Sequence, residues 1–350
     1  MILLRVLAFI LGFILAGLTV FSAVKTFVLP RAANDPLARF VFVTIRKVFN
    51  MLMRQARSYT QADRLMAFYA PVSLFMLLPT WLFLVMIGYT GMIWAVEGGS
   101  LYNAYLVSGS SLLTLGFTSS DSFPITILGF TEATIGLILV ALLIAYLPSM
   151  YSAFSRRESA VSMLEVRAGS PPFAVEMLVR YNRIHGLDKL SQQWETWEMW
   201  FTDIEESHTS LAALVFFRSP RPEHSWVTAA GAVLDAASLV RSSVDTPPDP
   251  RADLCIRAGF LALRHIADYF SYPYEPDPHY PVHPISLTRE DYDRGMETLA
   301  AAGVRLKKDR EQAWRDFAGW RVNYDQVLLA LARLTMAPDA PWLVQSRLHD

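Results

Sequence analysis

Five consecutive residues between two long apolar runs could coordinate a cation: Thr114, Leu115, Gly116, Phe117 and Thr118. The stretch before them, residues 101–113, suits a helix of about three turns, which is too short to cross a bilayer. A helix that dips into a membrane and continues as extended backbone offers carbonyl oxygens in place of the water around an ion. Gly116 permits backbone angles that a side chain forbids. Thr114 adds a hydroxyl ligand, and the helix directs its negative C-terminal end at the ion.

The apolar run that follows, residues 125–153, holds two further candidates for a pore or a gate. Glu132 is its only charged residue, and a carboxylate inside a membrane is a functional candidate by default. Because it lies near the outer end of the run, it could equally brace the preceding helix or reach water. Pro148 could kink the helix at a gate or mark the point where the helix leaves the bilayer.

Three apolar stretches must position these residues: 6–24, 65–96 and 125–153. Each reaches the length of about 20 residues that a helix needs to cross a bilayer. Hydrophobic residues make up 53% of the 350-residue chain and charged residues 18%, against about 25% charged residues in soluble domains. This composition excludes a disordered chain. We expect an all-α membrane protein with three transmembrane helices, a re-entrant pore loop and an all-helical cytoplasmic domain.

The distribution of charge predicts the orientation. Residues 1–152 carry 9 Lys and Arg against 5 Asp and Glu, whereas residues 153–350 carry 22 against 27. Most cations of the first part lie between residues 25 and 64, and such a loop stays in the cytoplasm. Arg5 before an apolar run is also compatible with a cleaved signal peptide. The basic loop that follows argues against that alternative. We expect a multi-pass protein of the plasma (inner) membrane with its N-terminus outside and its C-terminal domain in the cytoplasm.

Asp35 and Pro36 are typical of the first residues of a helix, with Asp as the N-cap and Pro in the first turn. Apolar and basic residues alternate through the following stretch, up to Arg57. This pattern fits a helix lying along the membrane surface, in contact with lipid and its headgroups. It fits an ordinary helix packed on the cytoplasmic domain equally well.

Several of these segments resemble the pore-loop potassium channels of the two-transmembrane type. That family's filter is Thr-Val/Ile-Gly-Tyr/Phe-Gly-Asp, and this chain has Thr-Leu-Gly-Phe-Thr-Ser at 114–119. Ser-Ser-Leu-Leu at 110–113, Thr-Glu-Ala-Thr-Ile-Gly at 131–136 and Tyr-Ser-Ala-Phe-Ser-Arg-Arg at 151–157 are also similar to it. The resemblance covers residues 36–157 and implies a filter at 114–118, a hinge at Gly136, a slide-like interfacial helix and potassium as the permeant ion.

The filter departs from the family pattern at two positions. Thr118 replaces the second glycine and Ser119 the aspartate. Because a β-branched residue resists positive φ, we expect the outermost ion site to differ. Filters with one central glycine, Thr-Ala-Gly-Phe, occur in the similar Trk/Ktr-type transporters, which have four pore repeats in one chain. This chain has one repeat, so a closed pore implies a homotetramer.

The resulting division of the chain has six parts. They are the first transmembrane helix at 1–29, a cytoplasmic linker with the interfacial helix at 30–64, the outer pore helix at 65–96, the re-entrant helix and filter at 97–124, the inner helix at 125–153 and the cytoplasmic helical domain at 154–350. Within the last part we predict helices near 172–185, 188–216, 225–243, 250–270, 288–302 and 305–336.

The predicted cytoplasmic domain offers few chemical motifs. Cys255 is the only cysteine, which excludes an internal disulfide and structural zinc sites built on several cysteines. No basic tract indicates nucleic-acid binding, and no nucleophile or nucleotide motif indicates an enzyme. His279 and His283 lie in a proline-rich stretch that does not place both rings on one helix face. Asp235, in an Ala- and Gly-rich helix, is more typical of a paired carboxylate than of a catalytic one.

The sequence therefore predicts a homotetrameric cation channel without a cofactor, a metal other than the permeant ion, or a nucleic-acid partner. Its gating stimulus and any cytoplasmic ligand are not indicated. A second hypothesis is a non-conducting membrane sensor or scaffold with a degenerate filter, which Thr118 and Ser119 favour. A third is a membrane-anchored enzyme that uses the loop of His279 and His283.

Overall fold

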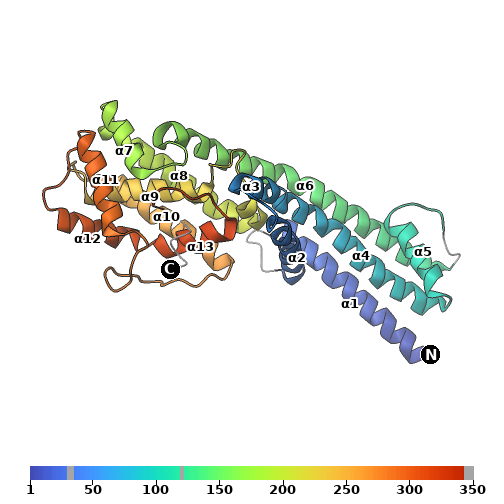
Figure 1. The fold of residues 1–350 in the computed structure, drawn as a ribbon. Helices are drawn as coiled ribbons and strands as arrows, with labels where there is room; N and C mark the ends of the chain where they lie inside the picture. The colour runs from blue at the N-terminus through green and yellow to red at the C-terminus, as the bar shows by residue number, and fades with distance from the viewer. Residues whose placement is uncertain (30–34, 119–121, 343–350) are drawn as a thin grey trace. The chain divides into compact units, whose positions relative to one another are not determined.

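A computed structural model describes residues 1–29, 35–118 and 122–342 of the chain (Figure 1). Within these ranges the regular structure is helical, apart from isolated bridge residues, which include the antiparallel pair Val244 and Leu306. The chain forms two compact units. The first unit comprises Met1–Ala56 and Leu65–Ser152, and the second comprises Arg57–Arg64 and Ala153–Asp350. The prediction of an all-helical protein is confirmed for the described residues.

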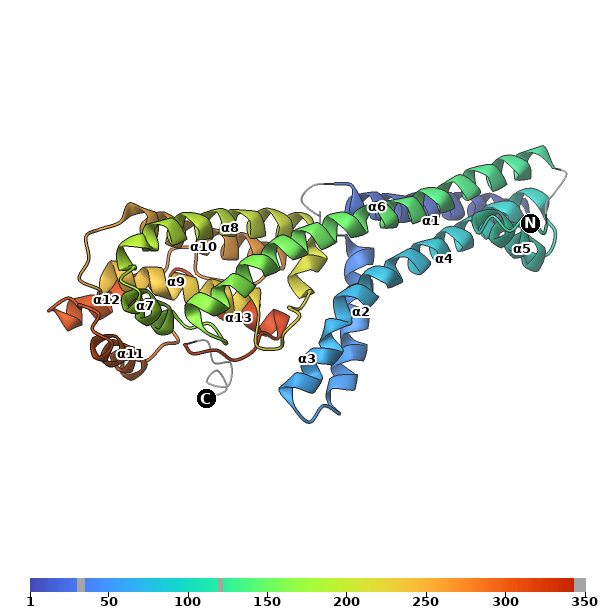
Figure 2. The same ribbon diagram turned by 90° about the horizontal axis from the view of Figure 1, so that it is seen from above.

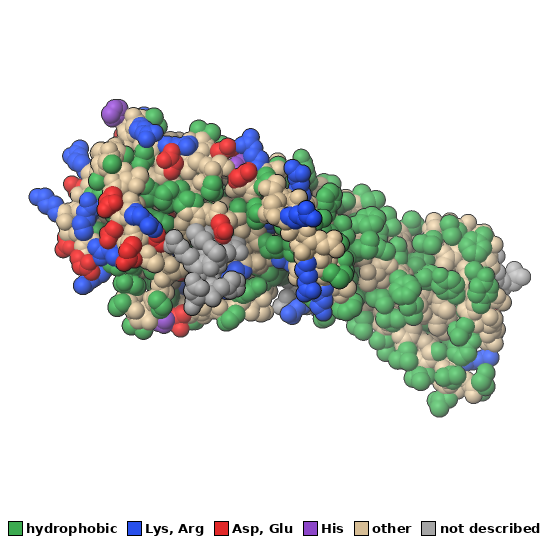
Figure 3. Space-filling view, in the orientation of Figure 1, with side chains coloured by type: hydrophobic (Ala, Val, Ile, Leu, Met, Phe, Trp, Pro, Cys, Tyr) green, Lys and Arg blue, Asp and Glu red, His purple; other side chains and the backbone are tan. Residues whose placement is uncertain are grey.

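The helices of the first unit include the apolar stretches of the sequence. They are α1 (Ile2–Phe27), α2 (Pro36–Met53), α4 (Tyr69–Glu97), α5 (Leu101–Leu112) and the first part of α6 (Phe123–Ala168), while α3 (Tyr59–Ala67) lies across the boundary of the units. Three helical stretches, Ile2–Phe27, Tyr59–Glu97 and Phe123–Ala168, are long and apolar enough to cross a membrane. Apolar side chains are spread along the first unit on the face that Figure 3 shows.

Glycines allow α1 and α4 to approach each other closely. A Cβ atom on Gly12 would collide with the carbonyl oxygen of Gly88, and one on Gly88 would lie 2.7 Å from the carbonyl oxygen of Gly12. At the other end of α1, Ser22 donates a hydrogen bond to Asp35 (2.6 Å) and accepts one from the Trp81 indole (3.0 Å). Backbone contact and hydroxyl bonding thus join these two helices.

The start of α2 is as predicted. The Asp35 carboxylate accepts a hydrogen bond from the amide of Ala38 (2.7 Å), and Pro36 occupies the first turn. One face of α2 buries Phe49 against Tyr69 of α4, whose ring centroid lies 5.9 Å away. Phe40 on α2 is exposed.

The second unit contains the remaining helices. They are α7 (Ala174–Arg183), η1 (Leu187–Lys189), α8 (Leu190–Ser210), η2 (Ala212–Phe216), α9 (Trp226–Ser242), α10 (Pro250–Tyr269), α11 (Arg289–Ala301), α12 (Arg310–Arg321) and α13 (Asp325–Thr335). Helix α9 is buried along nearly its whole length and is contacted by α7, α10, α12 and α13 (Figure 2). A Cβ atom on Gly231 would lie 2.9 Å from a methyl group of Leu328, so a larger residue there would displace that side chain.

Three predicted helix bounds in this region are wrong. The inner helix continues beyond residue 153 to Ala168 and ends at Gly169, which has φ +83°. The predicted helix over 188–216 ends at Ser210, after which the chain forms a short 3₁₀-helix. The one over 305–336 is two helices, because the Asn323 amide donates to the carbonyl oxygens of Gly319 and Trp320 in the last turn of α12. Such local bonds compete with helix continuation.

Candidate functional site

Helix α5 carries the candidate ion segment on its C-terminal end. The helix has 12 residues and is capped by the preceding Ser100, whose hydroxyl accepts a hydrogen bond from the Tyr102 amide (3.1 Å). At 1.5 Å per residue it spans about 18 Å, which is too short to cross a bilayer. Ala104 and Val107 are buried and pack with Ile93 of α4. The predicted short helix is confirmed by these bounds.

The segment 114–118 turns back on the last turn of α5. Thr114 and Gly116 have φ of 54° and 68°, in the left-handed region. The amides of Leu115 and Gly116 donate to the carbonyl oxygen of Ser110, at 2.8 and 3.4 Å. The Ser110 hydroxyl donates to the Thr118 carbonyl oxygen (3.1 Å) and accepts from the Thr118 amide (3.3 Å). The backbone is therefore not uniformly extended, and the β-branched residue at positive φ is Thr114 rather than Thr118.

The apolar side chains of this segment face away from the protein chain. Leu115 and Phe117 are each 60% exposed, and a Cβ atom on Gly116 would meet nothing within 4 Å. Ser119, the second departure from the family filter, lies outside the described residues. The candidate segment thus has a fixed origin on α5 and an open outer face.

Glu132 lies on α6, and its side chain is fully buried. One carboxyl oxygen, Oε1, lies 2.6 Å from the Ser108 hydroxyl on α5, and the other has no hydrogen-bond partner among the described residues. The same hydroxyl lies 3.1 Å from the carbonyl oxygen of Met86 on α4. The neighbouring Tyr89 donates to the Thr131 hydroxyl (3.1 Å). Glu132 and Ser108 thus join three helices.

Gly136 packs tightly where the sequence suggested a hinge. A Cβ atom on Gly136 would lie 2.5 Å from the carbonyl oxygen of Leu112, the last residue of α5. The geometry gives this glycine a contact role, while a hinge there remains a prediction. Pro148 is exposed, and α6 continues through it for 20 further residues to Ala168. Its assignment to a gate also remains a prediction.

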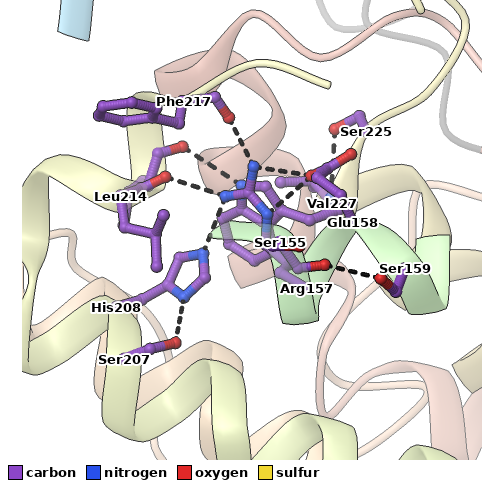
Figure 4. Close-up of polar contacts among 12 residues, drawn as sticks. Ser155, Arg157, Glu158, Ser159, Ser207, His208, Leu214, Phe217, Ser225 and Val227 are labelled. Carbon is purple, nitrogen blue, oxygen red and sulfur yellow. Dashed lines mark hydrogen bonds and ion pairs between the residues drawn. The ribbon is translucent and has the colours of Figure 1, made fainter. Parts of the chain in front are cut away.

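Arg157 forms a polar centre that sequence reasoning did not single out (Figure 4). Its guanidinium is fully buried in the second unit and binds Glu158 Oε1 from Nε (2.9 Å) and Nη2 (2.8 Å). It also donates to the carbonyl oxygens of Leu214 (2.9 Å) and Phe217 (2.7 Å). Arg157 was visible only as the second arginine after an apolar run, a position that resembles the basic end of a channel's inner helix.

His208 completes this centre. Its Nε2 atom lies 3.3 Å from Arg157 Nη1, and because a guanidinium can only donate, the imidazole nitrogen accepts. Its Nδ1 atom lies 3.2 Å from the Ser207 hydroxyl. Burial and the adjacent Arg157 cation lower the pKa of His208 well below its ordinary value. The histidine is therefore neutral at physiological pH.

The remaining sequence candidates lie in the second unit. Asp235 is buried and accepts hydrogen bonds from Arg321 (2.5 Å) and from the Tyr324 hydroxyl (2.8 Å). His283 Nδ1 accepts from the His279 amide (3.0 Å). Within the described ranges, no three His, Cys, Asp or Glu side chains are grouped to hold a metal ion.

Comparisons with family models, curated proteins and solved structures find no match to the chain. The interpretation of the site therefore depends on its own geometry and chemistry. That geometry consists of a short capped helix, an exposed loop with two left-handed residues, and a buried carboxyl on the following apolar helix.

Proposed function

We propose that the chain is one subunit of a homotetrameric pore-loop cation channel in the plasma membrane, with potassium as the main ion. One observation carries the proposal. Between two helices of membrane-spanning length lies a 12-residue helix whose C-terminal end leads into an exposed, non-helical segment. Such backbone at membrane depth is stable where it lines a water-filled path.

The chemistry of the segment suits a monovalent cation. Residues 114–118 contain no charged side chain, so their oxygens are those of backbone carbonyls and threonine hydroxyls. Neutral oxygens replace a hydration shell without holding the ion too tightly to leave. The negative end of α5 adds a favourable potential. Four copies around an axis would turn their open faces towards one another and close the path.

Ion flux into liposomes tests the proposal. The purified full chain is reconstituted with potassium or sodium gradients, beside empty vesicles, and Gly116→Ala is compared with Gly17→Ala. Gly116 has a positive φ, which costs alanine about 1 kcal/mol or more, whereas Gly17 on α1 has open space around it. We expect Gly116→Ala to abolish potassium flux and Gly17→Ala to leave it intact. Equal flux through both variants would overturn the assignment of the path.

A second function has an observation in its favour. The Thr118 carbonyl oxygen is bound to the Ser110 hydroxyl and is thereby diverted from an ion. A filter fixed in that way suits a membrane sensor or scaffold that retains a channel's architecture but does not conduct. Tetramers that pass neither potassium nor sodium would favour this second function.

A further inference from the structure

A buried carboxyl group with one unpartnered oxygen lies against α5, the helix that leads into the proposed filter. Glu132 is 0% exposed, and its Oε2 atom has no hydrogen-bond partner within the described part of the chain. Its Oε1 atom lies 2.6 Å from the Ser108 hydroxyl. A carboxyl group that is removed from water and offered a single partner needs a physical explanation.

The number of protons available for hydrogen bonds around Ser108 supplies that explanation. The Ser108 hydroxyl has a single proton and lies within hydrogen-bond distance of two oxygens, Oε1 of Glu132 and the carbonyl of Met86. A carbonyl oxygen has no proton to give, so Ser108 donates to Met86 if both contacts are hydrogen bonds. The proton in the other contact then belongs to the carboxyl group of Glu132.

The surroundings favour the same protonation state. No ion pair of the described residues includes Glu132. The titratable group that interacts with it is Tyr89 of α4, whose hydroxyl donates to Thr131 instead. An ionised carboxylate without a cation is costly in an apolar interior, whereas a neutral acid with one donated bond is not.

A second contact lies one turn further along the same two helices. Four residues after Ser108 and Glu132 come Leu112 and Gly136, and the Leu112 carbonyl oxygen fills the space that a side chain on Gly136 would need. Helix α6 therefore holds the last turn of α5 at two levels, by a hydrogen bond and by backbone contact. The segment 114–118 starts from that turn.

We propose that Glu132 is a positioning residue for the filter, held as a neutral carboxylic acid that donates to Ser108, which in turn donates to Met86. This chain of hydrogen bonds fixes α5 between α4 and α6 and so sets the place of residues 114–118. The proposal rests on the proposed channel function for its effect on flux, while the protonation state and the bracing of α5 do not depend on conduction.

Infrared spectroscopy of the full chain in nanodiscs tests the protonation state. A protonated carboxyl group gives a carbonyl stretch that a carboxylate lacks, and it is read as the difference between wild type and Glu132→Gln. We expect this band at neutral pH, shifted in heavy water, and absent from the matched difference for Glu97→Gln, an exposed acid at the end of α4. A spectrum without the band would overturn the neutral-acid assignment.

Amide hydrogen exchange and flux test the positioning role. Glutamine keeps a neutral donor to Ser108, whereas leucine of similar size does not. We expect Glu132→Gln to retain wild-type exchange at residues 113–118 and wild-type flux. Glu132→Leu should speed exchange there and lower flux by about tenfold, the loss typical of one buried hydrogen bond. Wild-type exchange in the leucine variant would refute the positioning role.

These readouts separate the two proposals. If wild-type protein conducts but Glu132→Leu conducts equally well, the positioning role is wrong and the channel stands. If wild-type protein passes no ion, the channel is wrong, and the exchange of Glu132→Leu against Glu132→Gln still decides whether the carboxyl group braces α5. Reduced tetramer yield in both variants would show that the group serves folding alone and would overturn the positioning role.

Discussion

The two units of the molecule bury their polar groups in different ways. In the first, the buried Glu132 is met by a hydroxyl group, and no charged partner is described for it. In the second, the buried Asp235 is met by Arg321 and the buried Arg157 by Glu158. On the face that Figure 3 shows, apolar side chains are spread along the first unit and charged ones over the second unit. Ionic pairing inside the chain thus accompanies a surface suited to water.

The helices of the two units are also held together by different means. In the first unit, backbone meets backbone at Gly12, Gly88 and Gly136. Helices that cross a membrane have no hydrophobic reason to associate within lipid, so close contact and hydroxyl bonds would supply the attraction if the long helices of this unit do so. The second unit packs large rings such as Trp194 and Phe317 in a shared core, as water-driven burial favours. Variants that remove one kind of contact at a time show how far each unit depends on it.

The largest effect is expected from Arg321→Met in the second unit. Arg321 is fully buried and binds Asp235 (2.5 Å), Asp325 (2.9 Å) and the carbonyl oxygen of Trp342 (2.7 Å). Methionine leaves two buried carboxylates without their cation, which costs about 3–5 kcal/mol. Thermal unfolding of the full chain in detergent measures the loss. Arg315→Met, on the exposed side of the same helix, is the control, and an equal drop in both would contradict the role of buried pairing.

Gly12→Leu should be the next largest effect, and it acts in the first unit. Its side chain would meet the carbonyl oxygen of Gly88 and force α1 away from α4. Overpacking of this kind costs about 1–3 kcal/mol and occasionally more. We expect a lower unfolding temperature and a smaller yield of monodisperse protein in gel filtration. Gly17→Leu, on the same helix in open space, should behave as wild type; if it is equally damaging, contact between the glycines is not what joins these helices.

Hydrophobic periodicity and composition were sufficient to predict several of the helices. The apolar runs gave the three long helices, and Asp35 with Pro36 gave the start of α2. Helix ends set by long-range or side-chain bonds were missed. The chain near Leu306 pairs with Val244, a residue far away in the sequence. The Asn323 side chain bonds back to the preceding turn, and helical periodicity alone does not register such a bond.

The sequence likewise predicted some residues of the candidate site but not the residues that they contact. Residue type drew attention to Gly116 and Glu132, because glycine and an intramembrane carboxylate are unusual in their contexts. The partner Ser108 was missed, since small hydroxyl residues are frequent and nothing in spacing alone pairs it with a residue 24 positions later. The fold of 114–118 onto Ser110 was missed for the same reason.

A smaller, pH-dependent effect is expected at His208. Its pKa is lowered in the folded protein, so the unfolded chain binds the proton more readily. Stability therefore falls as pH drops below about 6.5, the unfolded value, by up to about 1.4 kcal/mol per pH unit until the folded pKa is reached. The unfolding temperature of wild type minus that of His208→Gln should decline over this range. The exposed His185→Gln is the control, and a flat difference for His208→Gln, or one that declines no more than the control, would refute the role of His208.

The smallest effect is expected at Arg5 in the first unit. Its Nη2 atom donates to the carbonyl oxygen of Gly98 (3.3 Å), which ends α4 with φ +74°. A cation at a helix C-terminus contributes about 0.3–1 kcal/mol, so Arg5→Gln should lower the unfolding temperature slightly, and Arg5→Lys should lower it less. If charge matters less than backbone contact in this unit, each Arg5 variant must lower the unfolding temperature by less than Gly12→Leu does. A larger loss from Arg5→Gln than from Gly12→Leu would mean that ionic interactions hold the first unit as they hold the second, and the contrast between the units would fail.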